Sequence, residues 1–90
     1  MKTLMREFVS RVEEACGGKG EFVILLRHGR RDEAVRRILS KCRVKRKVSG
    51  VMVMGEWGGR EFSLFATGKL LLKGFKSREE AEEFLIKLLS

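Results

Sequence analysis

Few residues of this chain could take part in catalysis, and local spacing gives none of them a suitable neighbour. His28 is the only histidine, and so the only side chain that could act as a base near neutral pH. A serine, cysteine or threonine nucleophile needs such a base and a group that orients it, and no serine or cysteine lies beside His28 in the sequence. We therefore expect no enzymatic activity and interpret His28 as a turn residue.

The acidic and sulfur-containing side chains give no support for a metal or cofactor site. Four glutamates within residues 79–83 fall in the first turns of a predicted helix, where the helix dipole and solvation account for them. Cys16 and Cys42 lack the C-x-x-C spacing and the histidine partners of a zinc site. We expect no metal and no cofactor. The cysteines are interpreted as buried thiols, and a disulfide between them stays open if the source is a hyperthermophile.

The segment Leu26-Arg27-His28-Gly29-Arg30 follows an apolar run and resembles the Arg-His-Gly motif of the histidine phosphatases. In that family the histidine becomes phosphorylated, and a second histidine with further arginines completes the pocket. This chain has one histidine, and its 90 residues are too few for the phosphatase fold. The resemblance therefore does not lead to a phosphatase prediction.

Positive charge is concentrated in one segment. Between Arg27 and Lys47 there are ten basic residues and two acidic ones, which accounts for the whole net charge of +8. The remainder of the chain is neutral. A cluster of this size favours an acidic partner such as nucleic acid, with a solvated helix face as the simpler alternative.

Length and composition indicate a single domain over residues 1–90 with a modest core. No apolar run approaches the ~20 residues needed to span a membrane, and charges interrupt the first seven residues, where a signal peptide would be apolar. We expect a cytoplasmic protein without a membrane partner. The lack of Asn, Gln, Pro and Tyr beside abundant Lys, Arg and Glu leans toward a heat-adapted source.

Hydrophobic periodicity predicts the order helix, strand, helix, four strands, helix. The first helix is expected over residues 1–18, capped by Thr3, because apolar residues recur on one helical face. This face contains Leu4, Met5, Phe8, Val9, Val12, Ala15 and Cys16. A buried strand is expected over residues 21–27, and an amphipathic helix should follow it. Its inner face would carry Ala34, Val35, Ile38, Leu39 and Cys42, and its outer face Arg36, Arg37 and Lys41.

The four successive strands are expected over residues 43–48, 51–54, 61–66 and 69–73, with a glycine-rich loop at 55–60 and a turn at Thr67-Gly68. Ser77 and Glu80 form a capping box that begins the last helix. The predicted fold class is α+β, an antiparallel sheet of about five strands with helices packed on one face.

Residues 63–81 read Ser-Leu-Phe-Ala-Thr-Gly-Lys-Leu-Leu-Leu-Lys-Gly-Phe-Lys-Ser-Arg-Glu-Glu-Ala. This segment resembles the second half of one repeat of the TATA-box-binding protein family. The positions that match the family pattern are Phe65, Gly68, Lys69, Gly74, Lys76 and Glu80. Over residues 21–89 the predicted order of elements also matches one repeat, with the N-terminal helix as an addition.

The resemblance implies that the open face of the sheet binds nucleic acid, since that family wedges phenylalanines into the DNA minor groove. Phe65 and Val48 would occupy the two wedge positions, and Leu71 a position that lines the groove. Val48 replaces a phenylalanine and Lys73 a threonine of the family pattern, and one repeat is present instead of two. A homodimer would restore the two-fold arrangement.

Strand alternation independently places Phe65, Leu71 and Lys73 on the face away from Phe62, Leu64, Ala66, Leu70 and Leu72. In the strand 43–48, Lys45 and Lys47 are expected on one face, and Val44, Arg46 and Val48 on the other. The second helix should pack behind the sheet, which would direct Arg36 and Arg37 away from Phe65. The predicted nucleic-acid-binding residues are Arg30, Arg31, Arg43, Lys45, Lys47, Phe65, Lys69, Leu71 and Lys73.

The sequence predicts a non-catalytic protein that binds DNA or RNA, and it does not choose between these or between single and double strands. A sequence-tolerant mode needs only lysines on phosphates and Phe65 stacked on a base. The alternative is a protein-interaction module that docks a helix or sheet on Phe65, Leu71 and Met52 or Met54, with the basic helix meeting an acidic partner.

Overall fold

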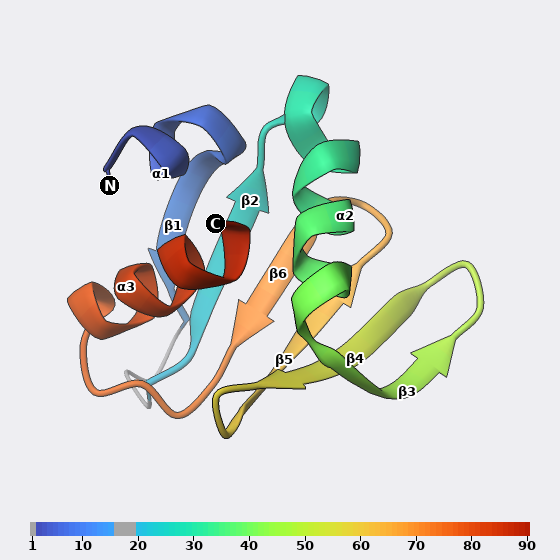
Figure 1. The fold of residues 1–90 in the computed structure, drawn as a ribbon. Helices are drawn as coiled ribbons and strands as arrows, with labels where there is room; N and C mark the ends of the chain where they lie inside the picture. The colour runs from blue at the N-terminus through green and yellow to red at the C-terminus, as the bar shows by residue number, and fades with distance from the viewer. Residues whose placement is uncertain (1, 16–19) are drawn as a thin grey trace.

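The structure, a computed structural model, describes residues 2–15 and 20–90 (Figure 1). Its elements follow in the order α1 (Lys2–Phe8), β1 (Val9–Glu14), β2 (Phe22–Leu26), the 3-10 turn η1 (His28–Arg30), α2 (Arg31–Lys41), β3 (Arg43–Val48), β4 (Met52–Trp57), β5 (Arg60–Phe65), β6 (Lys69–Leu72) and α3 (Arg78–Leu89). The α+β class predicted from the sequence is confirmed. None of the helices in the described ranges is long and apolar enough to cross a membrane.

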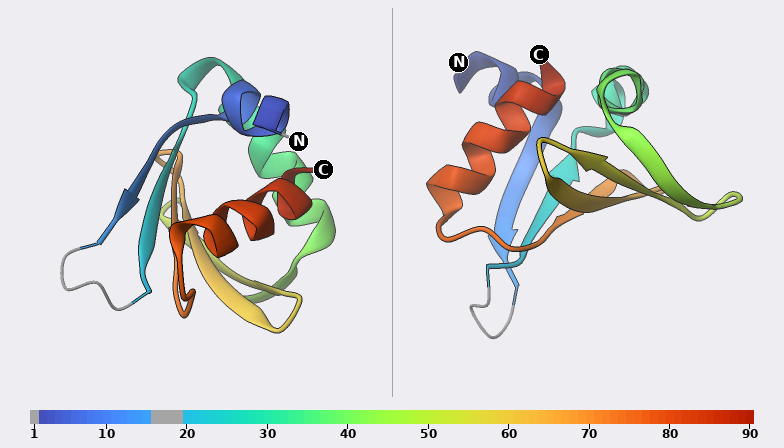
Figure 2. Two further views of the ribbon diagram at one scale, coloured as in Figure 1. Left: turned by 90° about the vertical axis from the view of Figure 1, so that its left-hand side faces the viewer. Right: turned by 60° about the horizontal axis from the view of Figure 1, so that its bottom comes forward.

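The strands form one antiparallel sheet of six strands in the order β1-β2-β6-β5-β4-β3. The three helices lie on one face of this sheet, and α3 contacts both α1 and α2 (Figure 2). The face without helices is called the open face below. Strand β2 lies inside the sheet, as its apolar run predicts, whereas β1 and β3 form the two edges.

The predicted helix over residues 1–18 is wrong beyond Phe8, and this segment supplies the sixth strand. Val9 and Val12 are both buried, at the helical spacing of three residues, but a bulge between Val9 and Arg11 produces that spacing in a strand. Ser10 occupies the bulge and donates its hydroxyl hydrogen to the carbonyl of Leu25 (3.2 Å). The end of the predicted helix, including Cys16, lies outside the described residues.

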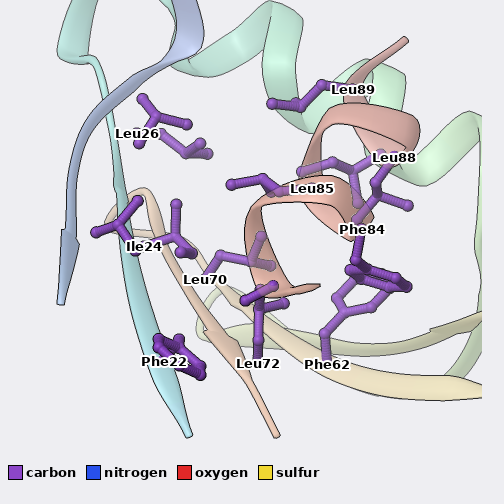
Figure 3. Packing of buried hydrophobic residues seen from close by; sticks show 14 of the residues in the cluster. Phe22, Ile24, Leu26, Phe62, Leu70, Leu72, Phe84, Leu85, Leu88 and Leu89 are labelled. Atoms are coloured by element: carbon purple, nitrogen blue, oxygen red, sulfur yellow. The ribbon is translucent and has the colours of Figure 1, made fainter. Parts of the chain in front are cut away.

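The core lies between the sheet and the helices (Figure 3). The strands contribute alternate residues, which are Phe22, Ile24, Leu26, Phe62, Leu64, Leu70 and Leu72. From α3 come Ala81, Phe84, Leu85, Leu88 and Leu89, and from α2 Ala34 and Ile38. The predicted inner faces of β5, β6 and α3 are therefore confirmed, except that Ala66 is exposed beyond the end of β5.

Short glycine turns connect the hairpins. Gly68 has φ +92° in the turn between β5 and β6, as the sequence predicts. The predicted loop over residues 55–60 is shorter than expected: β4 continues to Trp57, and only Gly58 and Gly59 form the turn. Both have positive φ, the combination that favours a two-residue hairpin.

The start of α3 follows the predicted capping box in part. Ser77 accepts a hydrogen bond from the backbone N–H of Glu80 (3.2 Å), which satisfies one donor of the first helical turn. The carboxylate of Glu80 pairs with Arg60 of β5. Arg60 also lies over the ring of Phe75, 4.2 Å from its centroid, so this contact joins the sheet to the beginning of α3.

Candidate nucleic-acid interface

The open face can be followed as rows of residues that oppose one another across the ladders, because directly opposed residues point to the same side of a sheet. The middle row, from β1 to β3, consists of Glu13, Val23, Leu71, Ser63, Met54 and Arg46. A second row runs along one side of the middle row. Its residues on β1, β2 and β6 are Arg11, Leu25 and Lys69, and its residues on β5, β4 and β3 are Phe65, Met52 and Val48. On the other side lie Glu61, Glu56 and Arg43.

An apolar area occupies the centre of this face. It consists of Val23, Leu25, Met52, Met54, Phe65 and Leu71, all of which are half-buried by their neighbours in the sheet. No helix of the described chain covers them (Figure 2). The predicted placement of Phe65 and Leu71 away from the core is therefore confirmed, and Val48 lies in the same row as Phe65.

Cationic side chains border the apolar area on two strands. Arg43, Lys45 and Arg46 project from β3, and Lys69 and Lys73 project from β6 or the residue after it. Lys73 lies near Glu61, whose pKa its charge helps to lower. All five side chains are exposed, so a bound anion could reach them without a change in the fold.

Four of these five cations have no hydrogen-bonding or ion-pair partner within the described part of the chain. Arg43, Arg46, Lys69 and Lys73 make no side-chain hydrogen bond or ion pair there, whereas Lys45 pairs with Glu61. The hydrogen bond from Lys45 lowers the pKa of Glu61, and the same bond and the negative charge of Glu61 raise the pKa of Lys45. Glu61 therefore competes with any phosphate for Lys45.

The expected division of β3 between the two faces holds for Arg46, Lys47 and Val48. It is wrong for Val44 and Lys45 because of a bulge, and Val44 opposes Gly55 on the face that carries the helices. The register shifts between Val44 and Arg46, so that Arg46 opposes Met54 and Lys47 opposes Val53. Arg46 thus lies on the open face, and Lys47 lies on the face that carries the helices. Lys45 occupies the bulge and reaches Glu61 on the open face.

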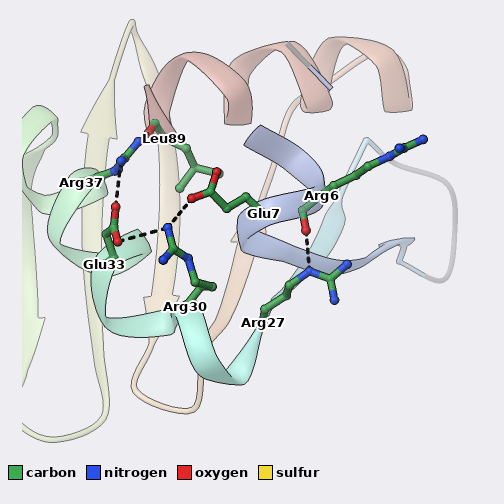
Figure 4. A network of polar contacts seen from close by, with 7 residues as sticks. All are labelled: Arg6, Glu7, Arg27, Arg30, Glu33, Arg37 and Leu89. Carbon is green, nitrogen blue, oxygen red and sulfur yellow. Dashed lines mark hydrogen bonds and ion pairs between the residues drawn. The ribbon is translucent and has the colours of Figure 1, made fainter. Parts of the chain in front are cut away.

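Arg30 and Arg31 were also predicted as binding residues. Arg30 lies between α1 and α2 (Figure 4), and Arg31, the first residue of α2, reaches the turn between β5 and β6. Arg30 pairs with Glu7 of α1 and with Glu33 of α2, and its guanidinium lies 4.9 Å from the ring centroid of Phe8. Arg31 donates a hydrogen bond to the carbonyl of Thr67 (3.0 Å). The structure therefore does not bring these two arginines to the open face.

Other members of the basic segment also serve the fold. Arg27 donates to the carbonyl of Arg6, and Arg37 donates to Glu33 (2.8 Å) and to the carbonyl of Leu89 (3.1 Å) (Figure 4). Lys41 donates to carbonyls at the end of α3. The bonds of Arg37 and Lys41 to carbonyls join α2 to the end of α3, and the bond of Arg27 joins the residue after β2 to α1. Helix α2 packs behind the sheet as expected, with Arg37 away from Phe65.

Sequence reasoning missed three residues of the open face: Arg46, Val23 and Leu25. The bulge beside Arg46 leaves no clear signal in a strand of alternating valines and cations. For Val23 and Leu25 a signal existed, because a run of five apolar residues in an interior strand must direct some of them to each face. With helices on only one face, the half-buried members had to point to the other.

The histidine and the cysteine of the described ranges lie apart from the open face. His28 is exposed in the η1 turn, as its interpretation as a turn residue predicts. Cys42 is half-buried, and burial raises the pKa of its thiol; Cys16, the other cysteine, lies outside the described residues. Among residues 2–15 and 20–90, no three His, Cys, Asp or Glu side chains gather where they could hold a metal ion.

Two grooves flank the helices. One of about 320 Å³ lies between α2 and the β3–β4 turn, where Leu39 and Val51 are exposed. Its lining also includes Val48, Met52 and Phe65, so it extends to the end of the apolar area of the open face. Leu39 was expected on the buried face of α2, which is therefore narrower than predicted. The other groove, of about 880 Å³, runs between β1 and α3.

A scan against protein-family models and searches of curated proteins and of solved structures find no match to this chain. The functional conclusion therefore rests on the open face itself.

Proposed function

We propose that this chain is a non-catalytic nucleic-acid-binding protein and that the open face is its binding surface. The observation that carries the proposal is the arrangement around Phe65. On β4 and β5, Phe65, Met52 and Met54 form an apolar strip between the cations of β3 and those of β6. Three strand spacings separate these two sets of cations, which is about 14 Å at ~4.8 Å per spacing.

This arrangement fits a strand of nucleic acid that crosses the sheet. A base stacks on Phe65, since every base has an apolar face and such stacking tolerates any sequence. The phosphates on either side then meet Arg43 and Arg46 or Lys69 and Lys73, which have no anionic partner among the described residues. We propose single-stranded DNA or RNA as the preferred ligand, because one aromatic side chain in a sheet of aliphatic neighbours favours stacking over insertion at two base steps.

The TATA-box-binding-like fold of residues 21–89 is also a proposal. It is supported by the order of β2, α2, β3 to β6 and α3 in this part of the chain. The strand β1 is an addition to that pattern. A cytoplasmic location stays a prediction from the sequence.

Fluorescence anisotropy with labelled single-stranded DNA, duplex DNA and RNA, each at several salt concentrations, tests the proposal. If the five cations that border the apolar area, Arg43, Lys45, Arg46, Lys69 and Lys73, all meet phosphates, the logarithm of the binding constant should fall with the logarithm of salt. The slope should be about −3.5 for a single strand and about −4.5 for a duplex. No binding at low salt by the folded protein would overturn the proposal and leave the protein-interaction alternative.

A matched pair of variants locates the surface. Arg46→Glu and Arg36→Glu make the same change of charge, but Arg46 lies on the open face and Arg36 on the exposed side of α2. We expect Arg46→Glu to weaken binding about tenfold or more and to reduce the salt slope by about one, with a much smaller effect of Arg36→Glu. Equal losses in both variants would show that net charge, and not the open face, governs binding.

A further inference from the structure

The outer edge of β1 has backbone groups that no strand of the described chain pairs. The N–H of Ala15 donates to the carbonyl of Glu21 (2.9 Å), so Ala15, Glu13 and Arg11 direct their backbone groups to β2. By the alternation of an antiparallel ladder, Val12 and Glu14 direct theirs outward. Such an edge is a template for a further strand.

We propose that a second copy of this chain pairs with this edge, strand β1 against strand β1, antiparallel about a two-fold axis at Val12. In this arrangement Val12 of one protomer opposes Val12 of the other, and each Arg11 opposes the Glu13 of the other protomer on the open face. The side chains of Arg11 and Glu13 are 66% and 49% exposed, and within one chain Nε of Arg11 lies 3.3 Å from Oε2 of Glu13. Two cross-strand ion pairs would form with little change of conformation.

Charge selects this register over its neighbours. A shift of the pairing that keeps each face intact places Arg11 opposite Arg11 or Glu13 opposite Glu13, and like charges directly opposed are destabilising. Any shift that exchanges the faces would turn the buried Val12 toward residues of the open face. The sequence of β1 is therefore complementary to itself in one register.

The groove beside β1 has the charge balance expected of a contact between identical chains. Four arginines and three glutamates line it, together with Met5, Val9, Val12 and Ile86. Among the charged side chains, Arg78 and Glu82 already pair (2.9 Å). A nearly neutral groove in a chain of net charge +8 is better suited to a second copy than to nucleic acid.

The opposite edge of the sheet has the contrary character. Strand β3 carries Arg43, Lys45, Arg46 and Lys47 and no acidic residue. Pairing two copies through β3 would place eight positive charges along one ladder, and edge lysines are a known barrier to such pairing. Of the two edges, β1 is therefore the one that fits another copy of the chain.

Sedimentation equilibrium on the full chain at 10–100 µM, at low salt, tests the inference. We expect a dimer for the wild type and at least tenfold weaker association for Arg11→Glu and for Glu13→Arg, since each places like charges opposite one another twice. The double variant Arg11→Glu/Glu13→Arg should restore association to within about threefold of the wild type, because it exchanges the charges symmetrically. Circular dichroism checks that each variant is folded.

Three outcomes would overturn the inference: a wild type that is monomeric at 100 µM, single variants that associate as the wild type does, or a double variant that does not recover. The dimer through β1 does not depend on nucleic-acid binding, so either proposal can be refuted while the other holds. Arg46→Glu should remain dimeric while losing affinity for a short oligonucleotide. Arg11→Glu should be monomeric in the sedimentation experiment, which contains no nucleic acid and so does not depend on the proposed binding.

Discussion

Gly55 is the position where one added methyl group should disturb the fold most directly. It is buried in β4, opposite Phe62 of β5. A Cβ atom at this position would lie 2.8 Å from Cζ and 3.1 Å from Cε1 of the Phe62 ring, and 3.0 Å from Sγ of Cys42. Carbon atoms pack best at about 3.5–4.0 Å, so Gly55→Ala requires the ring to retreat by about 0.7 Å or more.

The surroundings give the ring little room to retreat. Phe62 is 2% exposed, and its ring meets that of Phe84 edge to face, with centroids 6.3 Å apart. Overpacking of this kind costs about 1–3 kcal/mol, whereas replacing a strand glycine by alanine returns about 0.5–1 kcal/mol of backbone entropy. We expect a net loss of about 1–2 kcal/mol, which corresponds to a melting temperature about 5–15 °C lower for a domain of this size.

Thermal and urea unfolding followed by circular dichroism measures this loss. Gly29→Ala is the matched control, because a Cβ at Gly29 meets no atom within 4 Å and Gly29 does not have positive φ. The steric explanation also predicts that Phe62→Leu, which shortens the opposing side chain, makes Gly55→Ala less costly. A Gly55→Ala protein as stable as the wild type, or equal losses in both glycine variants, would refute it.

Three further predictions concern the open face and the helices. Phe65→Ala should weaken single-strand binding by about 1–3 kcal/mol, or about 5- to 150-fold, in anisotropy titrations, and unchanged affinity would exclude stacking on this ring. Arg30→Ala should lower the free energy of unfolding by about 1 kcal/mol, since it removes partly exposed ion pairs and the contact with Phe8, without changing that affinity. Glu61→Gln should tighten binding at low salt because it releases Lys45. The ion pair of Lys45 and Glu61 contributes to stability at a pH above the ordinary carboxyl pKa, and this contribution is lost as the pH falls through the lowered pKa of Glu61. The free energies of unfolding of the wild type and of Glu61→Gln should therefore converge in acid.

Elements whose signals are local could be predicted closely. The hairpin of β5 and β6 combines strict alternation with a turn glycine, and α3 begins at a serine whose side chain caps it. Each of these signals lies within a few residues of the element that it defines. This is why the sequence alone could place Phe65 and Leu71 on the face of the sheet that points away from the core.

Strand β1 could not be predicted in this way, because its signal is ambiguous within the segment itself. Val9 and Val12 satisfy a helical period, and also a strand with one extra residue between them. What decides is the neighbour: the N–H of Arg27 donates to the carbonyl of Phe8 (2.8 Å), and β2 offers an unpaired side to the residues that follow. Val9 and Val12 pair with Leu26 and Ile24 of that strand, and a choice made by this pairing is not visible in the local pattern.

The basic segment shows the same limit for the site. Its ten cations take different places in the fold, which composition does not distinguish. Arg27, Arg30, Arg31, Arg37 and Lys41 donate to carbonyls or carboxylates of the fold, whereas Arg43 and Arg46 remain available on the open face. Net charge therefore overstates the cations that this segment offers to a ligand. Lys69 of β6 and Lys73, the residue after β6, lie outside the segment and complete the binding surface. The salt slope distinguishes these descriptions, because a slope well beyond about −3.5 for a single strand would require more cations than the five that border the apolar area.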